Sequence, residues 1–333
     1  MKVFKQQGIA LVTALLIISI STIVAAQIFY KQQINLRRTF NQIQGDQVYQ
    51  LFLSSEQWAK IILLEDLENT SDTFLDIWAQ EMPPIEAEGG LFQARIIDYQ
   101  SCFNLNNLVI SGAAQDSQIK IFKALLRVKS TADMPLNENL IWNLVDWLDT
   151  DDEPKAQGSE WETYSQLIPP YRAANQALTE IGELYAVNEW NAEVVNALAD
   201  DICALPSPPA YSEVGRYFPA QTTAIPLNIN TISPILLSAL SDKMPSAAEL
   251  TQFIQLQHEE GFKSAQEFFD KLDELYPQEP KLSSTLPKAL LDIKSSYFML
   301  HYTGWIGNLE QQYKSLFYRD TKKIETLYRS RAY

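Results

Sequence analysis

Near its start the chain has 22 consecutive residues, from Ile9 to Tyr30, without one charged side chain. About 20 apolar residues are enough for an α-helix to cross a bilayer, so this run predicts a membrane-spanning helix. Basic residues flank the run on both sides, and the positive-inside rule therefore leaves its orientation open. These flanking residues are Lys2, Lys5, Lys31, Arg37 and Arg38.

Two processing events fit this N-terminus, and they leave different proteins. A secretory signal peptidase would cut after Ala26 and release a soluble chain that begins at Gln27. However, the apolar run is longer than the usual core of such a signal, and the single Gly8 separates a short basic leader from Ile9. This arrangement resembles a prepilin leader, which is cut between Gly8 and Ile9 and leaves the hydrophobic helix in place.

The apolar pattern continues as a stripe with helical spacing from Leu36 to Ile62. A continuous helix from Ile9 to about Leu64 would be on the order of 80 Å long at 1.5 Å per residue. A membrane-inserted rod that continues as a water-exposed amphipathic helix is typical of type IV pilin-like subunits. The alternative is a simple signal anchor with a stalk.

The balance of charge limits the expected partners. The 333 residues include 26 Lys and Arg against 41 Asp and Glu, for a formal net charge of −15. Phosphate backbones and anionic lipid surfaces are bound through cationic side chains, so this charge opposes both. We therefore expect no nucleic-acid partner, and the charge favours divalent cations and basic protein surfaces.

The two cysteines, Cys102 and Cys203, both lie beyond the membrane segment. In an oxidising compartment a disulfide between them would close a loop of about 100 residues and add roughly 4–5 kcal/mol in the chain-entropy model. Two buried free thiols are the alternative, which the sequence leaves open.

The order of predicted elements gives an α+β chain in five parts. Residues 1–8 form a leader, and residues 9–114 hold the long helix and a first strand at 91–99. Residues 115–223 form an inserted helical domain, and residues 224–290 a second helical unit that resembles a sterile-alpha-motif or helix-hairpin-helix unit. Residues 291–333 return to strands that complete the sheet begun near Leu91. The expected helices cover 117–126, 137–148, 173–178, 181–185, 189–198, 233–240, 247–259 and 264–275, and the expected C-terminal strands cover 296–306, 311–318 and 323–329.

An acidic cluster in the inserted helical domain is the strongest local signal for a cofactor. Calcium takes six to eight oxygen ligands, and crowded carboxylates repel one another unless a cation lies among them. The alternating acidic positions resemble an EF-hand loop, but Pro154 stands where that loop requires glycine. A solvated acidic loop is the alternative. The candidate ligands for one or two calcium ions are Asp146, Asp149, Asp151, Asp152, Glu153, Glu160 and Glu162.

The sequence offers little for an enzyme. The two histidines are His258 and His301, and Phe262 occupies the position where a zinc-protease motif starting at His258 needs its second histidine. No Gly-x-Ser-x-Gly elbow and no phosphate-binding glycine loop is present. We therefore expect a non-enzymatic protein.

The whole chain resembles the type II secretion system minor pseudopilin K family, also called general secretion pathway protein K. The landmarks run through the sequence in order, and their combination is specific. They are Gln7-Gly8-Ile9-Ala10-Leu11, Arg37-Arg38-Thr39, Phe103-Asn104-Leu105-Asn106-Asn107-Leu108, Asp146-Trp147-Leu148-Asp149 with Asp152-Glu153-Pro154, Pro170-Tyr171-Arg172-Ala173-Ala174-Asn175, Cys203-Ala204-Leu205-Pro206 and Leu227-Asn228-Ile229-Asn230-Thr231.

The resemblance implies a type IV pilin-like fold with a large helical insertion that binds calcium. It implies cleavage by a prepilin peptidase, N-methylation of Ile9, and a single pass through the inner membrane with the head in the periplasm. It also implies a place at the tip of the pseudopilus with minor pseudopilins I and J, and further contacts with H and the major pseudopilin G. There the protein would help to initiate assembly for the export of folded proteins across the outer membrane.

Thr13 provides a physical argument for the tip. Most pilins that this chain resembles carry Glu at the fifth mature residue, where its carboxylate pairs with the terminal amine of a neighbouring subunit. A first subunit has no such neighbour above it, and an unpaired carboxylate in hydrocarbon is costly. The Thr13 hydroxyl can instead bond to the helix backbone. The alternative is that threonine is merely tolerated here.

Two other functions remain open from the sequence. The first is a secreted calcium-dependent binding protein with a cleaved secretory signal, which would begin at Gln27. The second is a DNA-binding competence factor that uses the segment 227–240, but the net charge opposes it.

Overall fold

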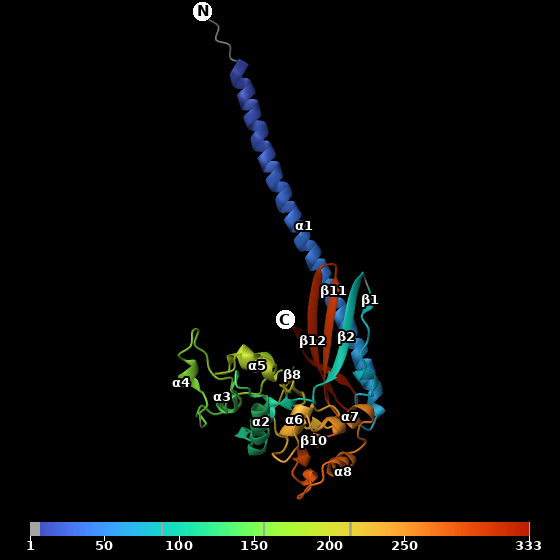
Figure 1. Ribbon diagram of the computed structural model, residues 1–333. Coiled ribbons are helices and arrows are strands. Elements are labelled where there is room, and N and C mark those ends of the chain that lie inside the picture. The colour runs from blue at the N-terminus through green and yellow to red at the C-terminus, as the bar shows by residue number, and fades with distance from the viewer. Residues whose placement is uncertain (1–6, 88, 156, 213–214, 333) are drawn as a thin grey trace, which may run out of the picture.

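The computed structural model describes residues 7–87, 89–155, 157–212 and 215–332. Its longest element is the helix α1 (Gln7–Glu65), which runs unbroken for 59 residues. The first part of α1 extends away from the rest of the molecule, and its C-terminal part lies along a β-sheet (Figure 1). This confirms the predicted continuous rod, while the predicted leader lies mostly outside the described residues.

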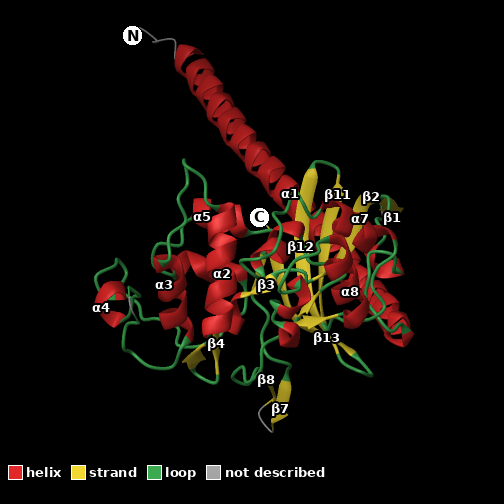
Figure 2. Cartoon of the chain, turned by 60° about the horizontal axis from the view of Figure 1, so that its bottom comes forward, coloured by secondary structure: helices red, strands yellow, loops and turns green. Residues whose placement is uncertain are grey.

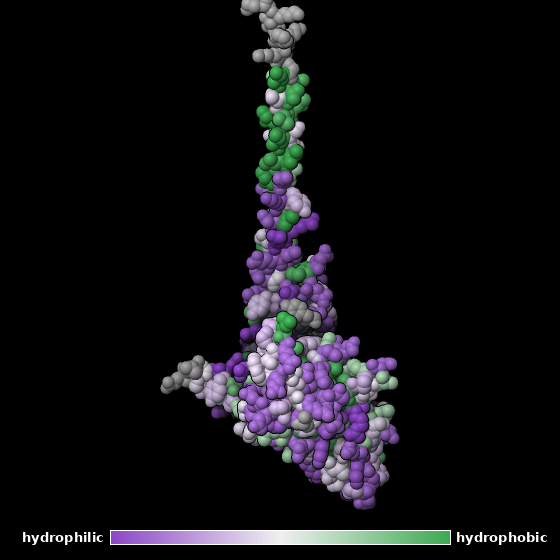
Figure 3. Space-filling view, turned by 90° about the vertical axis from the view of Figure 1, so that its left-hand side faces the viewer, coloured by the Kyte–Doolittle hydropathy of each residue, from purple (hydrophilic) through white to green (hydrophobic). Residues whose placement is uncertain are grey.

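The projecting part of α1 has an apolar surface. Green, hydrophobic side chains cover its outer end in Figure 3, and polar side chains follow toward the head. In the part of the chain that the structure describes, one helix, Ile9–Glu68, is long and apolar enough to cross a membrane. Its most apolar stretch has a mean hydropathy of 2.6, and none of that stretch is buried. A secretory signal near the N-terminus can also contain such an apolar helix, so these properties establish a candidate membrane anchor.

A five-stranded antiparallel sheet forms the head around the C-terminal part of α1. The strand order is β1-β2-β11-β12-β13, so the last three strands of the chain complete the sheet that β2 begins. This confirms the predicted C-terminal meander and the pilin-like α+β class. The bounds are β1 (Ile85–Ala87), β2 (Gly90–Asp98), β11 (Tyr297–Ile306), β12 (Leu309–Arg319) and β13 (Ile324–Ala332).

The C-terminal part of α1 packs closely against one face of this sheet. Phe52 is fully buried, and its ring lies 4.9 Å from that of Tyr313. A side chain at Gly304 would bring a Cβ atom to 2.8 Å from Val48 Cγ1, so glycine permits the close approach of strand and helix. The apolar stripe predicted along α1 therefore divides in two: Val48, Phe52 and Ile62 are buried in the head, whereas Leu36, Phe40 and Ile43 are exposed.

A helical region is inserted between β2 and β11, and Figure 2 shows its first helices to one side of the sheet. Its α-helices are α2 (Asp116–Lys129), α3 (Asn139–Leu148), α4 (Trp161–Tyr164), α5 (Ala192–Leu198), α6 (Pro234–Ala239), α7 (Thr251–Glu259) and α8 (Ala265–Leu275). Short strands link them: β3 (Phe103–Asn104), β4 (Val109–Ile110), β5 (Ala113–Ala114), β6 (Ile202–Cys203), β7 (Ala210–Ser212), β8 (Gly215–Tyr217), β9 (Leu227–Asn228) and β10 (Leu291–Asp292). The 3₁₀ turns are η1 (Asp66–Glu68), η2 (Ile77–Ala79), η3 (Leu105–Leu108), η4 (Ile181–Ala186), η5 (Leu282–Ser284) and η6 (Lys288–Leu290).

The two helical units predicted at 115–223 and 224–290 share one hydrophobic core. A single cluster of buried side chains extends from Phe103 to Leu291, and α2 of the first unit contacts α6 of the second. The head has its own core between α1 and the sheet. The predicted boundary near residue 223 therefore lies within a single packed region, because the apolar faces of the helices before and after it pack against each other.

Three of the predicted helices need correction. Residues 173–178 are all described, and they form no helix; Asn175 has a left-handed φ of 49°. The helix predicted at 189–198 begins at Ala192, because Glu189 has a φ of 66° and the Asn191 side chain caps the helix at Val194. The helix predicted at 247–259 begins at Thr251. Sequence analysis also missed α4.

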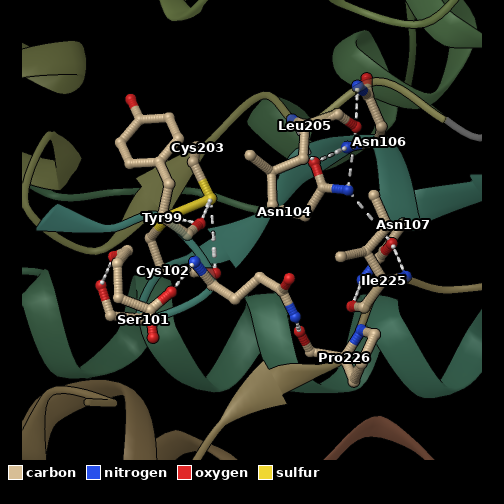
Figure 4. Close-up of a disulfide and its surroundings, with 12 residues drawn as sticks. Tyr99, Ser101, Cys102, Asn104, Asn106, Asn107, Cys203, Leu205, Ile225 and Pro226 are labelled. Atoms are coloured by element: carbon tan, nitrogen blue, oxygen red, sulfur yellow. Dashed lines mark hydrogen bonds between the residues drawn. A yellow bond between two sulfur atoms is a disulfide. The ribbon is translucent and has the colours of Figure 1, made fainter. Parts of the chain in front are cut away.

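Three buried asparagines and a disulfide fasten the start of the helical region to segments near its middle (Figure 4). Cys102 and Cys203 are bonded, with Cα atoms 5.8 Å apart, next to the parallel pair of β3 and β6. Asn104 Oδ1 accepts a hydrogen bond of 2.9 Å from the N–H of Leu205. Asn106 and Asn107 donate to Leu178 O and Ile225 O, each at 2.9 Å. The three amide side chains thus bridge segments that are distant in sequence.

Candidate functional site

Three carboxylates are buried together where α3 ends and α4 begins. Asp146 lies on the last turn of α3, Asp149 follows that helix directly, and Glu160 immediately precedes α4. Their exposed fractions are 0%, 1% and 4%. The apolar side chains of α3 pack into the core of the helical region, so this helix fixes the position of two of the three carboxylates.

These carboxylates have too few partners for their burial. Within the described residues, Asp149 Oδ1 and both oxygens of Glu160 have no hydrogen-bond partner. Asp146 accepts the backbone N–H of Lys155 at 3.0 and 3.2 Å. Buried charged groups are normally paired or bound to a metal, so these oxygens are candidate ligands for a cation.

Electrostatics at the cluster also favour an added cation. The pKa of Asp146 is raised to about 6 and that of Glu160 to about 7, with burial as the largest cause of both shifts. Repulsion from Asp146 and Asp149 contributes to the rise at Glu160, and burial followed by repulsion from Asp151 raises the pKa of Asp149. A divalent cation among these oxygens would reverse these effects, because it stabilises the ionised form.

Gly158 and Lys155 fold the loop back over Asp146, and sequence analysis missed both roles. A Cβ atom on Gly158 would lie 1.9 Å from Asp146 Oδ2, so only glycine fits. The Lys155 ammonium lies 2.9 Å from Asp151 Oδ2 and 3.7 Å from Asp149 Oδ2. A glycine five residues after the acidic run that ends at Glu153 was the one visible signal for this turn.

The structure separates the seven predicted ligands into two groups. Asp151 and Asp152 lie near the buried carboxylates, since both raise the pKa of Glu160. Asn175 supports this side of the loop by donating to Asp152 Oδ1 at 3.1 Å and to the Asp151 carbonyl. All four of these carboxylates outside the buried set are exposed, and Glu153 and Glu162 are the weakest candidates because they are not among the groups that raise the pKa of Glu160. Carboxylate oxygens are the ligands that a hard cation such as calcium takes.

A second acidic cluster, which the sequence did not suggest, joins the head to the helical region. The carboxylates of Asp66, Asp72 and Asp76 each have an oxygen within 4.8 Å of the others. Arg319 at the end of β12 pairs with Asp66 at 2.8 Å and also with Asp72. A guanidinium group therefore supplies the positive charge here, and we assign this cluster to structure.

The N-terminal residues singled out in the sequence lie on the projecting helix. Gly8 and Ile9 are in the first turns of α1, and the Ile9 side chain is 71% exposed. The Thr13 hydroxyl donates to the carbonyls of Ile9 and Ala10 at 3.1 and 3.0 Å. Its hydrogen bond is thus made within α1 and requires no neighbouring chain.

Comparisons with known proteins match this architecture. Two family models, both described as type II secretion system (T2SS), protein K, match residues 101–207 and 227–287. Type II secretion system protein K of Aeromonas hydrophila is 30% identical over 95% of this chain and 93% of its own length. The protein of the same name from Pseudomonas aeruginosa is 32% identical over 81% of this chain and 78% of its own length.

A solved structure supports the same fold. A chain in the crystal structure of the GspK-GspI-GspJ complex from the enterotoxigenic Escherichia coli type 2 secretion system superposes with a TM-score of 0.73. The match covers 89% of this chain and 99% of that one, at 24% identity. With its relatives matched over almost their full length, the chain belongs to the type II secretion system protein K family.

Proposed function

We propose that the protein is a non-enzymatic minor pseudopilin that caps the tip of the type II secretion pseudopilus. It is anchored in the inner membrane by α1 and carries its head in the periplasm. One observation carries this proposal: α1 is a single helix whose apolar part is free of the head, while its C-terminal part is buried in a pilin-like sheet. Such a subunit can join a filament through α1 and leave its bulky head outside.

The bulk of the head supports a terminal position. The helical region enters and leaves the sheet between β2 and β11 and lies beside it (Figure 1). A repeating filament lattice would have to accommodate this volume at every step, whereas the end of a filament has no subunit above it. The internal hydrogen bond of Thr13 agrees with this position, because it needs no neighbour in the membrane.

Sequencing the N-terminus of the membrane-bound protein tests the anchor. We expect Ile9 as the first residue, N-methylated, and loss of processing in a Gly8→Val variant. A mature chain that begins at Gln27 and is free in the periplasm would contradict the proposal. It would favour a secreted cation-dependent binding protein instead.

We propose further that the helices of minor pseudopilins I and J pack on the exposed part of the apolar stripe. Leu36, Phe40 and Ile43 are 71%, 64% and 51% exposed and follow one another at helical spacing. Phe40→Asp should reduce co-purification with I and J, whereas Gln42→Asp, on another side of the same turn, should not. Equal co-purification of both variants would exclude this surface.

Calcium is the cation that we propose for the buried carboxylates. Asp146, Asp149 and Glu160 would hold it, with Asp151 and Asp152 as further ligands. The ion would supply the positive charge that these carboxylates lack and so hold the loop between α3 and α4 closed. Unpartnered oxygens on buried Asp149 and Glu160 support this proposal.

A calcium titration of thermal stability tests the site in the full chain in detergent. Calcium bound only to the folded state raises the melting temperature. We expect this rise to disappear in Asp149→Asn and Glu160→Gln and to persist in Glu162→Gln, whose side chain is exposed. A rise that survives both substitutions would show that the ligand set is wrong.

A further inference from the structure

We propose that Lys155 is a built-in counterion of the carboxylate cluster, and that a divalent cation must displace its ammonium group in order to bind. Lys155 would then set the cation concentration at which the site fills. This inference rests on the proposed cation site. It adds a competing group that belongs to the chain itself.

Lys155 contacts the carboxylate cluster through both its ammonium group and its backbone N–H. Its ammonium group donates to both oxygens of Asp151, at 2.9 and 3.1 Å, and lies 3.7 Å from Asp149 Oδ2. Its backbone N–H donates to Asp146 at 3.0 Å. The backbone contact tethers the residue, so the ammonium group stays close to these carboxylates whether or not it is bound to them.

The ammonium group is an incomplete partner for the cluster. It carries one charge and three donors, and it leaves Asp149 Oδ1 and both oxygens of Glu160 without hydrogen bonds within the described part of the chain. These three oxygens are buried, and the carboxylates of Asp149 and Glu160 that carry them repel each other. A divalent cation brings twice the charge and can bind oxygens from several directions, so it satisfies groups that Lys155 does not reach.

Displacement is sterically simple. The Lys155 side chain is 38% exposed, whereas that of Asp149 is 1% exposed. The flexible four-carbon chain of lysine can therefore turn into solvent while the backbone N–H remains on Asp146. Arg172, the other cation between residues 146 and 172, stacks on Trp161 with its guanidinium carbon 4.6 Å from the ring centroid.

Two effects follow from this competition. The apparent affinity for the cation is lowered by the fraction of molecules in which Lys155 occupies the cluster. In the absence of the cation, Lys155 offsets part of the carboxylate repulsion and keeps the loop between α3 and α4 folded. The loop would thus be formed before the cation arrives, and the cation would tighten it.

The experiment compares Lys155→Met with Lys271→Met in the full chain in detergent. Lys271 pairs with Glu274 at 2.8 Å at a similar exposure, on a distant helix, and is the matched control. We expect Lys155→Met to lower the calcium dissociation constant about two- to fivefold, the upper part of the range typical of an exposed ion pair. Its melting temperature should fall in chelator and equal that of wild type in saturating calcium. Lys271→Met should leave the dissociation constant unchanged.

A second measurement needs no variant and separates displacement from a general charge effect. Acetylation of lysines in the wild-type protein, quantified by peptide mass spectrometry, should become faster at Lys155 when calcium is added and stay constant at Lys271. If calcium binds but neither the acetylation of Lys155 nor the affinity of Lys155→Met changes, the inference is overturned and the cation site stands. If calcium has no effect on wild-type stability, the cation site itself is wrong.

Discussion

Glu56 on α1 and Arg329 on β13 form two hydrogen bonds of 2.8 Å across 273 residues of sequence. The Glu56 carboxylate is fully buried, and it also accepts a hydrogen bond from Ser315 on β12. Arg329 is 43% exposed, so it brings its charge from the surface. The last strand of the chain is thereby fastened to the helix that carries the head.

Arg329→Met should destabilise the head by about 1–3 kcal/mol, because it leaves Glu56 buried without its charge partner. The estimate lies below that for a fully buried pair, since water reaches Arg329. Urea unfolding followed by tryptophan fluorescence measures the loss. Lys271→Met, which removes an exposed pair, should change stability by less than about 0.5 kcal/mol. Equal losses in both variants would mean that the buried carboxylate finds another partner.

Replacing Cys102 and Cys203 together by serine should cost roughly 4–5 kcal/mol in the chain-entropy model. The two cysteines are 101 positions apart in the sequence, and the loop that their bond closes contains half of the helical region. Guanidinium unfolding of the variant should match that of reduced wild type and should not respond to reductant. A variant as stable as the oxidised protein would show that the asparagine contacts alone hold the two segments together.

The elements that were predicted well are those whose signals are local in sequence. The apolar run and the stripe behind it predicted α1 to within two residues at each end. The aromatic and branched residues of 296–329 predicted three strands and their antiparallel order. In these elements one face is apolar, and apolar residues therefore recur in the sequence at the helical or strand period, where they can be recognised directly.

The parts that were missed depend on contacts between distant residues. The segment 173–178 looks helical by composition, but Asn106, 72 positions earlier, binds both the N–H and the C=O of Leu178, so neither group is left for a helical hydrogen bond. The pairing of Arg319 with Asp66 spans 253 positions. For the acidic loop, the residue types suggested a cation. Only the structure shows which carboxylates are buried and that Lys155 lies among them.

Gly158→Ala should destabilise the loop between α3 and α4 by about 1–3 kcal/mol and weaken its response to calcium. The new methyl group would lie 1.9 Å from Asp146 Oδ2 and force the loop and the carboxylate apart. Thermal unfolding with and without calcium measures both effects. Gly182→Ala is the control, because the structure has nothing within 4 Å of a Cβ atom at that position. If both variants behave like wild type, the loop is not closed over Asp146 in solution.

His301 should make the head less stable as the pH falls below about 6.5. Burial on β11, followed by repulsion from Arg95 and Lys314 on the neighbouring strands, lowers the pKa of His301 to about 4. The folded state thus keeps His301 neutral, while the unfolded chain takes up a proton near pH 6.5. The stability that comes from the neutral form is complete above this value and is lost as the pH falls toward 4.

Between pH 7.5 and pH 5 this effect should amount to about 1–2 kcal/mol. His301→Gln cannot take up the proton, so its stability should fall less over the same range in urea unfolding at each pH. Thr303→Val, on the same strand and without a titratable group, should keep the wild-type slope. If the unfolding free energy of His301→Gln depends on pH as steeply as that of wild type, other groups cause the acid sensitivity. The packing lost with a neutral imidazole would lower stability equally at every pH.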